Sequence, residues 1–194
     1  MIYLMRHGDT LFNVEGRLLG QTDIPLCPIG VENVKLTASS LKRINIDCIF
    51  SSSYLRALQT AEILASATGA AVNVNKDFRE RNLGIMDGQF KDSSKWSDLV
   101  ARLGEKEFIP PEGESVDACT DRFSRALEFV TKGISGNVLI VSHAGVISLY
   151  MRYVLKIKSK QSLLGNCAFH TLAVGADEQL CVEQLNTSFL RGNT

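Results

Sequence analysis

The chain opens with MIYLMRHG, residues 1–8, in which five largely apolar residues run directly into Arg6, His7 and Gly8. A short apolar run of this kind is typical of a buried β-strand. It ends in a cation and an imidazole, and open α/β proteins bind their ligands outside the carboxyl ends of their strands. The segment therefore predicts a central strand that brings Arg6 and His7 to a ligand site at one edge of a sheet.

Two later segments repeat this arrangement. Residues 47–51 (DCIFS) form a second apolar run, and the helix expected after it carries Arg56 in its first turn. Residues 137–141 (NVLIV) end in Ser142-His143-Ala144-Gly145. Because the carboxyl ends of parallel strands meet at the same edge of a sheet, we expect two arginines and two histidines to lie close together there.

The rest of the chain alternates helical and strand patterns, which is typical of a largely parallel sheet covered by helices on both faces. Pro28 suits the first turn of a helix, and Gly69 suits the end of the next one. The expected helices span about 28–43, 54–68, 115–133 and 145–155, and the further strands span about 71–74, 167–174 and 179–186. The sequence therefore predicts a three-layer α/β/α sandwich with a mostly parallel sheet.

The length of 194 residues fits a single domain that spans the whole chain. Residues 78–115 depart from the alternation, because glycine and proline interrupt them around one short helix at about 96–103. We interpret about 85–113 as a lid or insertion over the sheet edge, with Trp96 either packing its helix or bordering a substrate pocket. The polar loop 9–28 is long for a compact domain, and such loops are usually functional.

The composition narrows the classes of function and of partner. Twenty-one basic residues balance 21 acidic residues, so no broad nucleic-acid or membrane-surface footprint is indicated. Neither an 18-residue apolar run nor a signal-peptide pattern occurs. The five cysteines are scattered, without C-x-x-C or a metal-ligand spacing. We therefore expect a cytoplasmic protein with reduced thiols, no metal or cofactor, no nucleic-acid or membrane partner, and a monomeric or homodimeric state.

Several motifs follow one another in the order found in one known family. They are Leu4-Met5-Arg6-His7-Gly8-Asp9-Thr10 with Asn13, Gly20-Gln21-Thr22-Asp23, residues 51–61 with Arg56, Glu80 before Gly84, Gly113-Glu114-Ser115, and Ser142-His143-Ala144-Gly145. Together they resemble the histidine phosphatase superfamily, which has the phosphoglycerate mutase-like fold. The match extends from residue 1 to about residue 155, and it implies phosphoryl-transfer chemistry at the strand ends.

The residue types suit phosphoryl transfer without a metal. A phosphoryl group spreads charge over three oxygens, so such a catalyst needs several fixed cations and donors around one nucleophile. Arg6 and Arg56 can supply forked, permanently charged donors, and His143 and the amide of Ala144 can supply two more. His7 is the candidate nucleophile, which would form a phosphohistidine through one ring nitrogen while a backbone carbonyl holds the other. The arginine charges should keep its ring neutral.

Glu80 is the carboxyl group that we expect to protonate the leaving oxygen and later to activate water. The resemblance also implies contacts to phosphate or substrate from Gly8, Asn13, Gln21 and Thr22. Structural alternatives stay open for these residues. Glu80 could form a surface ion pair with Arg79 or Arg81, Arg56 could extend from an exposed helix turn, and polar loop residues often cap the backbone. His170, in an expected strand, is interpreted as structural.

Three classes of function remain. The leading one is a metal-independent phosphomonoesterase that hydrolyses a small phosphorylated metabolite through a phosphohistidine at His7. The second is a phosphoglycerate mutase, which returns the phosphoryl group to another hydroxyl of the bound intermediate. The third is a non-catalytic phosphate-binding protein, and the presence of His7, Glu80 and both arginines argues against it.

One departure from the family pattern favours the hydrolase. Mutases of this family resemble one another in having a tyrosine where Leu83 stands and an adjacent pair of arginines in the insertion. Here the only arginine between Gly84 and Gly113 is Arg102. We therefore expect water to be the phosphoryl acceptor. The short chain and its LMRHGDT opening resemble α-ribazole-phosphate phosphatases, so α-ribazole phosphate is one candidate substrate.

Overall fold

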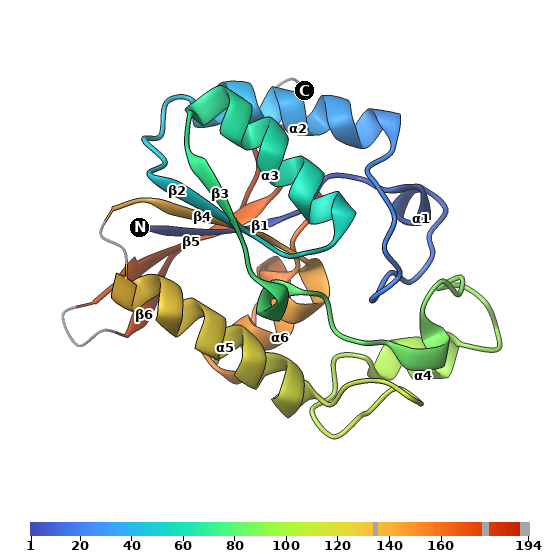
Figure 1. Ribbon diagram of the computed structural model, residues 1–194. Helices are drawn as coiled ribbons and strands as arrows, with labels where there is room; N and C mark the ends of the chain where they lie inside the picture. The colour runs from blue at the N-terminus through green and yellow to red at the C-terminus, as the bar shows by residue number, and fades with distance from the viewer. Residues whose placement is uncertain (134–135, 176–178, 191–194) are drawn as a thin grey trace.

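A computed structural model describes residues 1–133, 136–175 and 179–190. Its centre is a six-stranded sheet that lies between two layers of helices (Figure 1). The strands are β1 (Ile2–Arg6), β2 (Cys48–Ser51), β3 (Ala71–Val74), β4 (Val138–Ser142), β5 (Phe169–Val174) and β6 (Leu180–Thr187), in the order β3-β2-β4-β1-β5-β6. The α/β sandwich expected from the alternating patterns is confirmed.

The sheet is mixed. Strands β3, β2, β4 and β1 are parallel, whereas β5 runs antiparallel to β1, and β6 antiparallel to β5. In the register of the parallel strands, Arg6 pairs with Ser142, and Ser51 pairs with Val141. The strands that carry His7, His143 and the start of the Arg56 helix therefore end side by side, as the sequence predicts.

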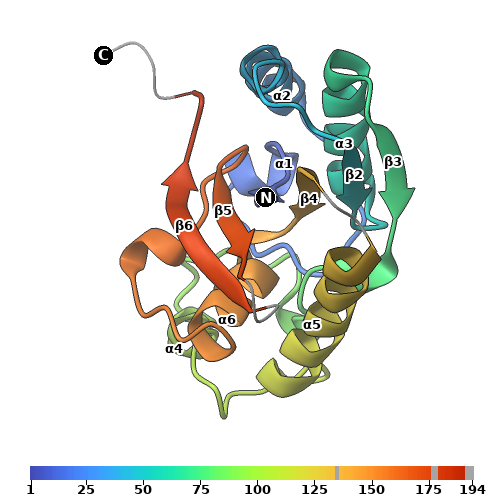
Figure 2. The same ribbon diagram turned by 90° about the vertical axis from the view of Figure 1, so that its left-hand side faces the viewer.

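Two pairs of helices cover the sheet, one pair on each face (Figures 1 and 2). Helices α2 (Pro28–Leu41) and α3 (Leu55–Thr68) lie on one face, and α5 (Val116–Gly133) and α6 (Ala144–Tyr153) on the other. Pro28 opens α2, and Gly69 ends α3 with a φ of 76°. Shorter pieces complete this part of the chain: α1 (Leu11–Val14), α4 (Ser97–Arg102), and the 3₁₀ turns η1 (Lys76–Phe78), η2 (Gly84–Met86) and η3 (Lys160–Ser162).

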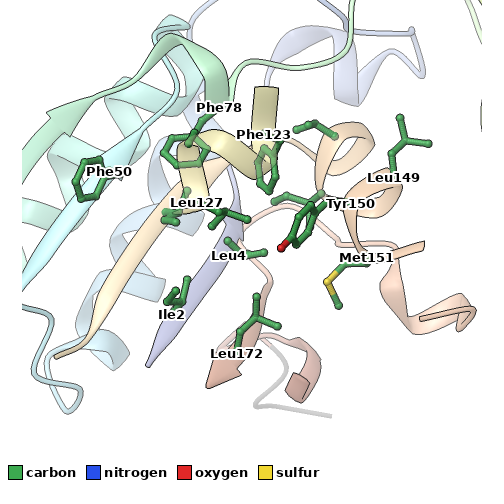
Figure 3. Packing of buried hydrophobic residues seen from close by; sticks show 14 of the residues in the cluster. Ile2, Leu4, Phe50, Phe78, Phe123, Leu127, Leu149, Tyr150, Met151 and Leu172 are labelled. Carbon is green, nitrogen blue, oxygen red and sulfur yellow. The ribbon is translucent and has the colours of Figure 1, made fainter. Parts of the chain in front are cut away.

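Strand β1 lies between two hydrophobic cores, which explains why its apolar residues are not interrupted. Leu4 belongs to the core under α5 and α6, and Met5 belongs to the core under α2 and α3. In the first core, Phe123 packs against Phe78 with ring centroids 5.4 Å apart and against Tyr150 at 5.2 Å (Figure 3). The two cores therefore fix the position of β1, and His7 follows directly from its end.

The segment from η2 to Gly113 surrounds a third, smaller hydrophobic cluster, which also includes Leu18 of the long N-terminal loop. Trp96 is buried in this cluster, and its indole N–H donates to Gln89 Oε1 at 3.2 Å. Trp96 thus packs the insertion, and it is not among the residues that line the cavity described below. Helix α4 lies within one residue of the expected helix at 96–103. That this segment acts as a lid of a single domain stays a prediction.

Candidate active site

A cavity of about 520 Å³ opens where β1 ends, between the first turn of α6 and the insertion. Its polar lining includes Arg6, His7, Asn13 and Glu80, together with Ala144 and Gly145 at the start of α6. Seven further lining residues are aliphatic and are here called the aliphatic wall: Leu18, Leu19, Leu83, Val100, Leu103, Leu149 and Leu163. Arg17, Arg81, Lys91, Gly104 and Ser148 complete the lining. Of the five predicted catalytic residues, Arg6, His7 and Glu80 line this cavity. The other two lie next to it: His143 packs against His7, and Arg56 is bonded to His143.

His7 is the first residue after β1, and its ring is held in a single orientation. Its backbone N–H donates to the Ser142 carbonyl at 3.0 Å, and its Nδ1 lies 2.7 Å from the Gly8 carbonyl oxygen. A carbonyl can only accept, so Nδ1 carries the proton and Nε2 of the neutral ring keeps its lone pair. Burial, together with the charges of Arg56 and Arg6, holds the pKa of His7 well below its ordinary value of 6.5. The ring is therefore poised to act as a nucleophile near neutral pH.

Arg6 lines this cavity and has an unused hydrogen-bond donor. Its Nη1 donates to the Leu164 carbonyl at 3.0 Å, whereas its buried Nε finds no hydrogen-bond partner among the described residues. Burial lowers the pKa of Arg6, although the charges of Glu80 and Asp9 oppose that shift. A buried, unpaired guanidinium N–H is costly unless a ligand satisfies it, and an anion such as phosphate would do so.

Arg56 and His143 lie beside His7 but do not line the cavity. Arg56 Nε donates to His143 Nδ1 at 3.2 Å, and His143 Nε2 lies 2.8 Å from Ser52 Oγ. Because arginine can only donate, His143 Nδ1 accepts and its Nε2–H donates to Ser52. The rings of His143 and His7 meet edge to face, with centroids 5.1 Å apart. Burial, followed by the charge of Arg56, holds the pKa of His143 well below its ordinary value.

The fork of Arg56 is used by the N-terminal loop. Nη1 donates to the Thr22 carbonyl at 2.8 Å, and Nη2 donates to the Gly20 carbonyl at 2.7 Å. Arg56 is fully buried, so the alternative of an exposed, extended side chain is wrong. Each of its three nitrogens already donates to a protein acceptor in this structure. Direct contact between Arg56 and a phosphate stays a prediction.

Glu80 occupies the N-terminus of α6. Its Oε1 accepts from the backbone N–H groups of Arg81 and Val146, each at 2.8 Å, and its Oε2 accepts from Gly145 N–H at 2.9 Å. These three N–H groups fix the carboxyl group of Glu80 at the start of the helix. Glu80 is 7% exposed and forms no ion pair within the described part of the chain. The alternative of a surface ion pair with Arg79 or Arg81 is therefore wrong.

Asn13 and Ala144 line the cavity, as expected for ligand contacts. The side-chain oxygen of Asn13 caps the turn of α1 by accepting from Thr10, and it also accepts from Asn166 Nδ2 at 3.3 Å. The side-chain nitrogen Nδ2 of Asn13 has no acceptor among the described residues, so it can donate to a ligand. Ala144 is the first residue of α6, and its N–H is placed to do the same.

Gly8, Gln21 and Thr22 are placed differently, since none of them lines the cavity. The Gly8 N–H donates to Thr60 Oγ1 at 3.1 Å, and an added Cβ would approach Val34 Cγ2 to 2.6 Å. Thr22 donates through its N–H and its hydroxyl to Asp87 Oδ2, at 2.7 and 2.9 Å. In this structure Gly8 serves close packing and Thr22 joins the N-terminal loop to the insertion. Their contacts to substrate remain predictions.

The sequence did not predict a largely buried ion pair between Arg122 and Glu114, next to the backbone of Glu80. Arg122 Nε lies 2.8 Å from Glu114 Oε1, and its Nη2 lies 2.9 Å from Oε2. The same guanidinium donates to the carbonyls of Asp77, Arg79 and Glu80, at 2.8, 2.7 and 3.1 Å. The sequence pattern includes Gly113-Glu114-Ser115 but assigns no role to Glu114. Arg122 lies inside the amphipathic helix α5, where no local sequence pattern distinguishes a buried arginine from an exposed one.

Comparison with known proteins agrees with this geometry. The chain belongs to the histidine phosphatase superfamily (branch 1), whose family model matches residues 2–187. An Escherichia coli protein described as "probable phosphoglycerate mutase GpmB" is 32% identical over 176 residues, which cover 86% of this chain and 81% of that protein.

Solved structures of phosphatases share the fold. A mycobacterial glucosyl-3-phosphoglycerate phosphatase, in complex with VO3, superposes with a TM-score of 0.84 at 26% identity over 96% of this chain and 98% of the other. An E. coli K-12 protein provisionally named an alpha-ribazole-5'-P phosphatase superposes with a TM-score of 0.80 at 22% identity, over 96% and 95% of the two chains. Among the described helices, none is long and apolar enough to cross a membrane.

Proposed function

We propose that this protein is a cytoplasmic, metal-independent phosphomonoesterase that uses a phosphohistidine at His7. The observation that carries the proposal is the orientation of His7, whose Nδ1 is tied to the Gly8 carbonyl at 2.7 Å so that its Nε2 is left with a lone pair. Arg6 with an unsatisfied Nε and Glu80 line the same cavity. All five cysteines are free, which supports a reducing compartment.

The reaction proceeds in two displacements. First, His7 Nε2 attacks phosphorus while the ester P–O bond breaks, and Glu80 in its protonated form gives its proton to the leaving alkoxide. Next, water attacks phosphorus, the N–P bond breaks, and Glu80 takes a proton from the water. Inorganic phosphate leaves and the enzyme returns to its starting state. Arg6 and the first N–H groups of α6 stabilise the charge on the phosphoryl oxygens in both steps.

The test measures phosphate release from p-nitrophenyl phosphate in the presence of excess chelator. Activity should survive, and His7→Ala should abolish both turnover and acid-labile phosphorylation of the protein. A melting curve of the variant shows whether it is folded. Full activity in a folded His7→Ala protein, or loss of activity with the chelator, contradicts the mechanism. α-Ribazole phosphate belongs in the first panel of physiological esters.

The relationship to a phosphoglycerate mutase supports a second candidate function. A mutase must retain phosphoglycerate by its carboxylate. Arg102 cannot do this from its present position, since it pairs with Glu105 at 3.1 Å and does not line the cavity. Lys91 does line the cavity, and its ammonium has no acceptor among the described residues. Burial, followed by the charge of Arg6, lowers the pKa of Lys91. Lys91 is therefore the candidate contact for a carboxylate.

The two functions predict different products. The assay compares interconversion of 3-phosphoglycerate, with added 2,3-bisphosphoglycerate, against phosphate release from a panel of monoesters. We expect hydrolysis to be faster. Isomerisation faster than every hydrolysis would instead identify a mutase, and Lys91→Met should then raise KM for phosphoglycerate more than it affects p-nitrophenyl phosphate.

A further inference from the structure

We infer that the physiological substrate is a phosphate monoester whose alcohol is largely apolar, an aryl or medium-chain alkyl group, and this inference rests on the proposed phosphatase activity. The observation behind it is the composition of the cavity lining. The candidate catalytic residues Arg6, His7 and Glu80 share the cavity with the seven side chains of the aliphatic wall. An alcohol whose phosphate is held at His7 therefore lies among these aliphatic side chains.

The polar residues near the wall have little left to offer an alcohol rich in hydroxyl groups. The guanidinium of Arg81 donates to the carbonyls of Glu114, Leu103 and Phe108, at 2.8, 2.8 and 2.6 Å. Arg17 donates to the Gly88 carbonyl and to Glu15, and it stacks on Phe12 with 3.9 Å between its Cζ and the ring centre.

The remaining polar lining does not alter this conclusion. The Gly104 carbonyl already accepts from the Tyr153 hydroxyl at 2.6 Å. Apart from Asn13 and the catalytic residues, this leaves Ser148 and Lys91 as the polar lining residues whose side chains form no hydrogen bond within the described part of the chain. A sugar would therefore bury several hydroxyls without partners, whereas an apolar group would displace water from the wall at no such cost.

The dimensions of the cavity fit this class of substrate. A volume of about 520 Å³ lies within the usual range for pockets that enclose a small organic ligand. The wall continues to the surface, where the Leu163 side chain is 62% exposed. Alkyl groups longer than the enclosed space can therefore extend past Leu163, and we expect the gain from added length to level off there.

The experiment measures kcat/KM for methyl, propyl and hexyl phosphate and for glucose 6-phosphate. All four are esters of primary alcohols or methanol with similar leaving groups, so differences report binding of the alcohol rather than chemistry. We expect kcat/KM to rise along the alkyl series, by at most about fourfold per methylene group, and glucose 6-phosphate to fall below hexyl phosphate. A flat series, or faster hydrolysis of glucose 6-phosphate, overturns the apolar class but leaves the phosphatase intact. No phosphate release from any ester, p-nitrophenyl phosphate included, overturns both.

A matched pair of variants locates the effect at the wall. Leu163→Asn should reduce the dependence on chain length, whereas Leu36→Asn should not, because Leu36 is equally exposed at 61% but lies on α2 and does not line the cavity. Val100→Asn tests a second wall position, in the insertion. An unchanged chain-length dependence in both Leu163→Asn and Val100→Asn overturns the inference.

Discussion

Gly145 lies directly against the carboxylate of Glu80. The Gly145 N–H donates to Glu80 Oε2 at 2.9 Å, and a Cβ added to Gly145 would come within 2.6 Å of Oε1 and 2.9 Å of Cδ. No side chain fits between them, so the second residue of α6 must be glycine if Glu80 is to reach the helix N-terminus. The position of the proposed acid thus depends on a residue 65 positions away in the sequence.

The first prediction concerns this contact. Gly145→Ala should displace Glu80 and reduce kcat/KM for alkyl phosphates, within the range of about 10²- to 10⁴-fold typical of a lost general acid. Steady-state kinetics measure the effect. The control is Gly165→Ala, where an added Cβ meets nothing within 4 Å. Equal activity in the two variants would show that the tight approach to Glu80 is not needed.

A second prediction separates proton transfer from phosphate binding. Glu80→Gln keeps the shape of the side chain but cannot protonate the leaving group. The loss should be about 10²- to 10⁴-fold for an alkyl phosphate and much smaller for p-nitrophenyl phosphate, whose alcohol leaves without help. The measurement is kcat/KM for both esters. Equal losses on the two substrates would exclude Glu80 as the acid.

The third prediction concerns the buried Arg122–Glu114 pair. Burial by itself raises the pKa of Glu114, but hydrogen bonds and charge from Arg122 outweigh burial and lower it. Glu114→Gln leaves Arg122 buried without its counter-charge and should cost about 3–5 kcal/mol in the free energy of unfolding. Urea denaturation measures this value. Glu32→Gln, which breaks the exposed pair with Lys35, should cost no more than about 1 kcal/mol.

Activity provides a second readout for this pair. Because Arg122 donates to the carbonyls of Arg79 and Glu80, we infer that it positions the backbone that carries the acid. Arg122→Lys keeps the charge but not the fork, so kcat should fall more for an alkyl phosphate than for p-nitrophenyl phosphate. A fall of the same size for both substrates, or no fall in a folded variant, would limit Arg122 to stability.

The fourth prediction is a pH dependence of stability. Burial and the nearby arginines hold the pKa values of His7 and His143 well below 6.5 in the folded protein, so as the pH falls the unfolded chain takes up these protons first. The free energy of unfolding should be retained above about pH 6.5 and should decline below it, by up to about 1.4 kcal/mol per pH unit for each histidine.

Urea denaturation between pH 5 and 8 measures this slope, and His7→Asn should remove the contribution of one histidine. The folded pKa of His170 is also lowered by burial, and its ring nitrogens form hydrogen bonds with backbone groups of Ser162 and Asn186. His170 therefore adds to the slope in both proteins. Stability that is constant from pH 5 to 7, or a slope unchanged by His7→Asn, would contradict the assignment of a neutral His7.

The amino-acid sequence by itself determined the central strands, the covering helices and the meeting of Arg6, His7 and His143. The strands and helices follow from the spacing of apolar residues within segments of about ten residues. The meeting of the three side chains follows because the carboxyl ends of parallel strands lie at the same edge of a sheet. The register that pairs Arg6 with Ser142 confirms this reasoning. The sequence did not predict that β5 and β6 are antiparallel to their neighbours. The direction of a strand depends on the path of the connection that precedes it, and not on the residue pattern within the strand.

Only the tertiary structure decided how each polar side chain is used. The Glu80 carboxylate meets N–H groups of α6 from 65 and 66 residues away, and Arg122 reaches the Glu80 carbonyl across 42 residues. Thr22, for which a contact to substrate stays a prediction, bonds to Asp87 from 65 residues away. Every residue except proline has a backbone N–H and a carbonyl, so the sequence does not indicate which of these groups a side chain will bond. The sequence likewise does not show whether a charged residue is buried or exposed. Such contacts are set only when distant segments pack together.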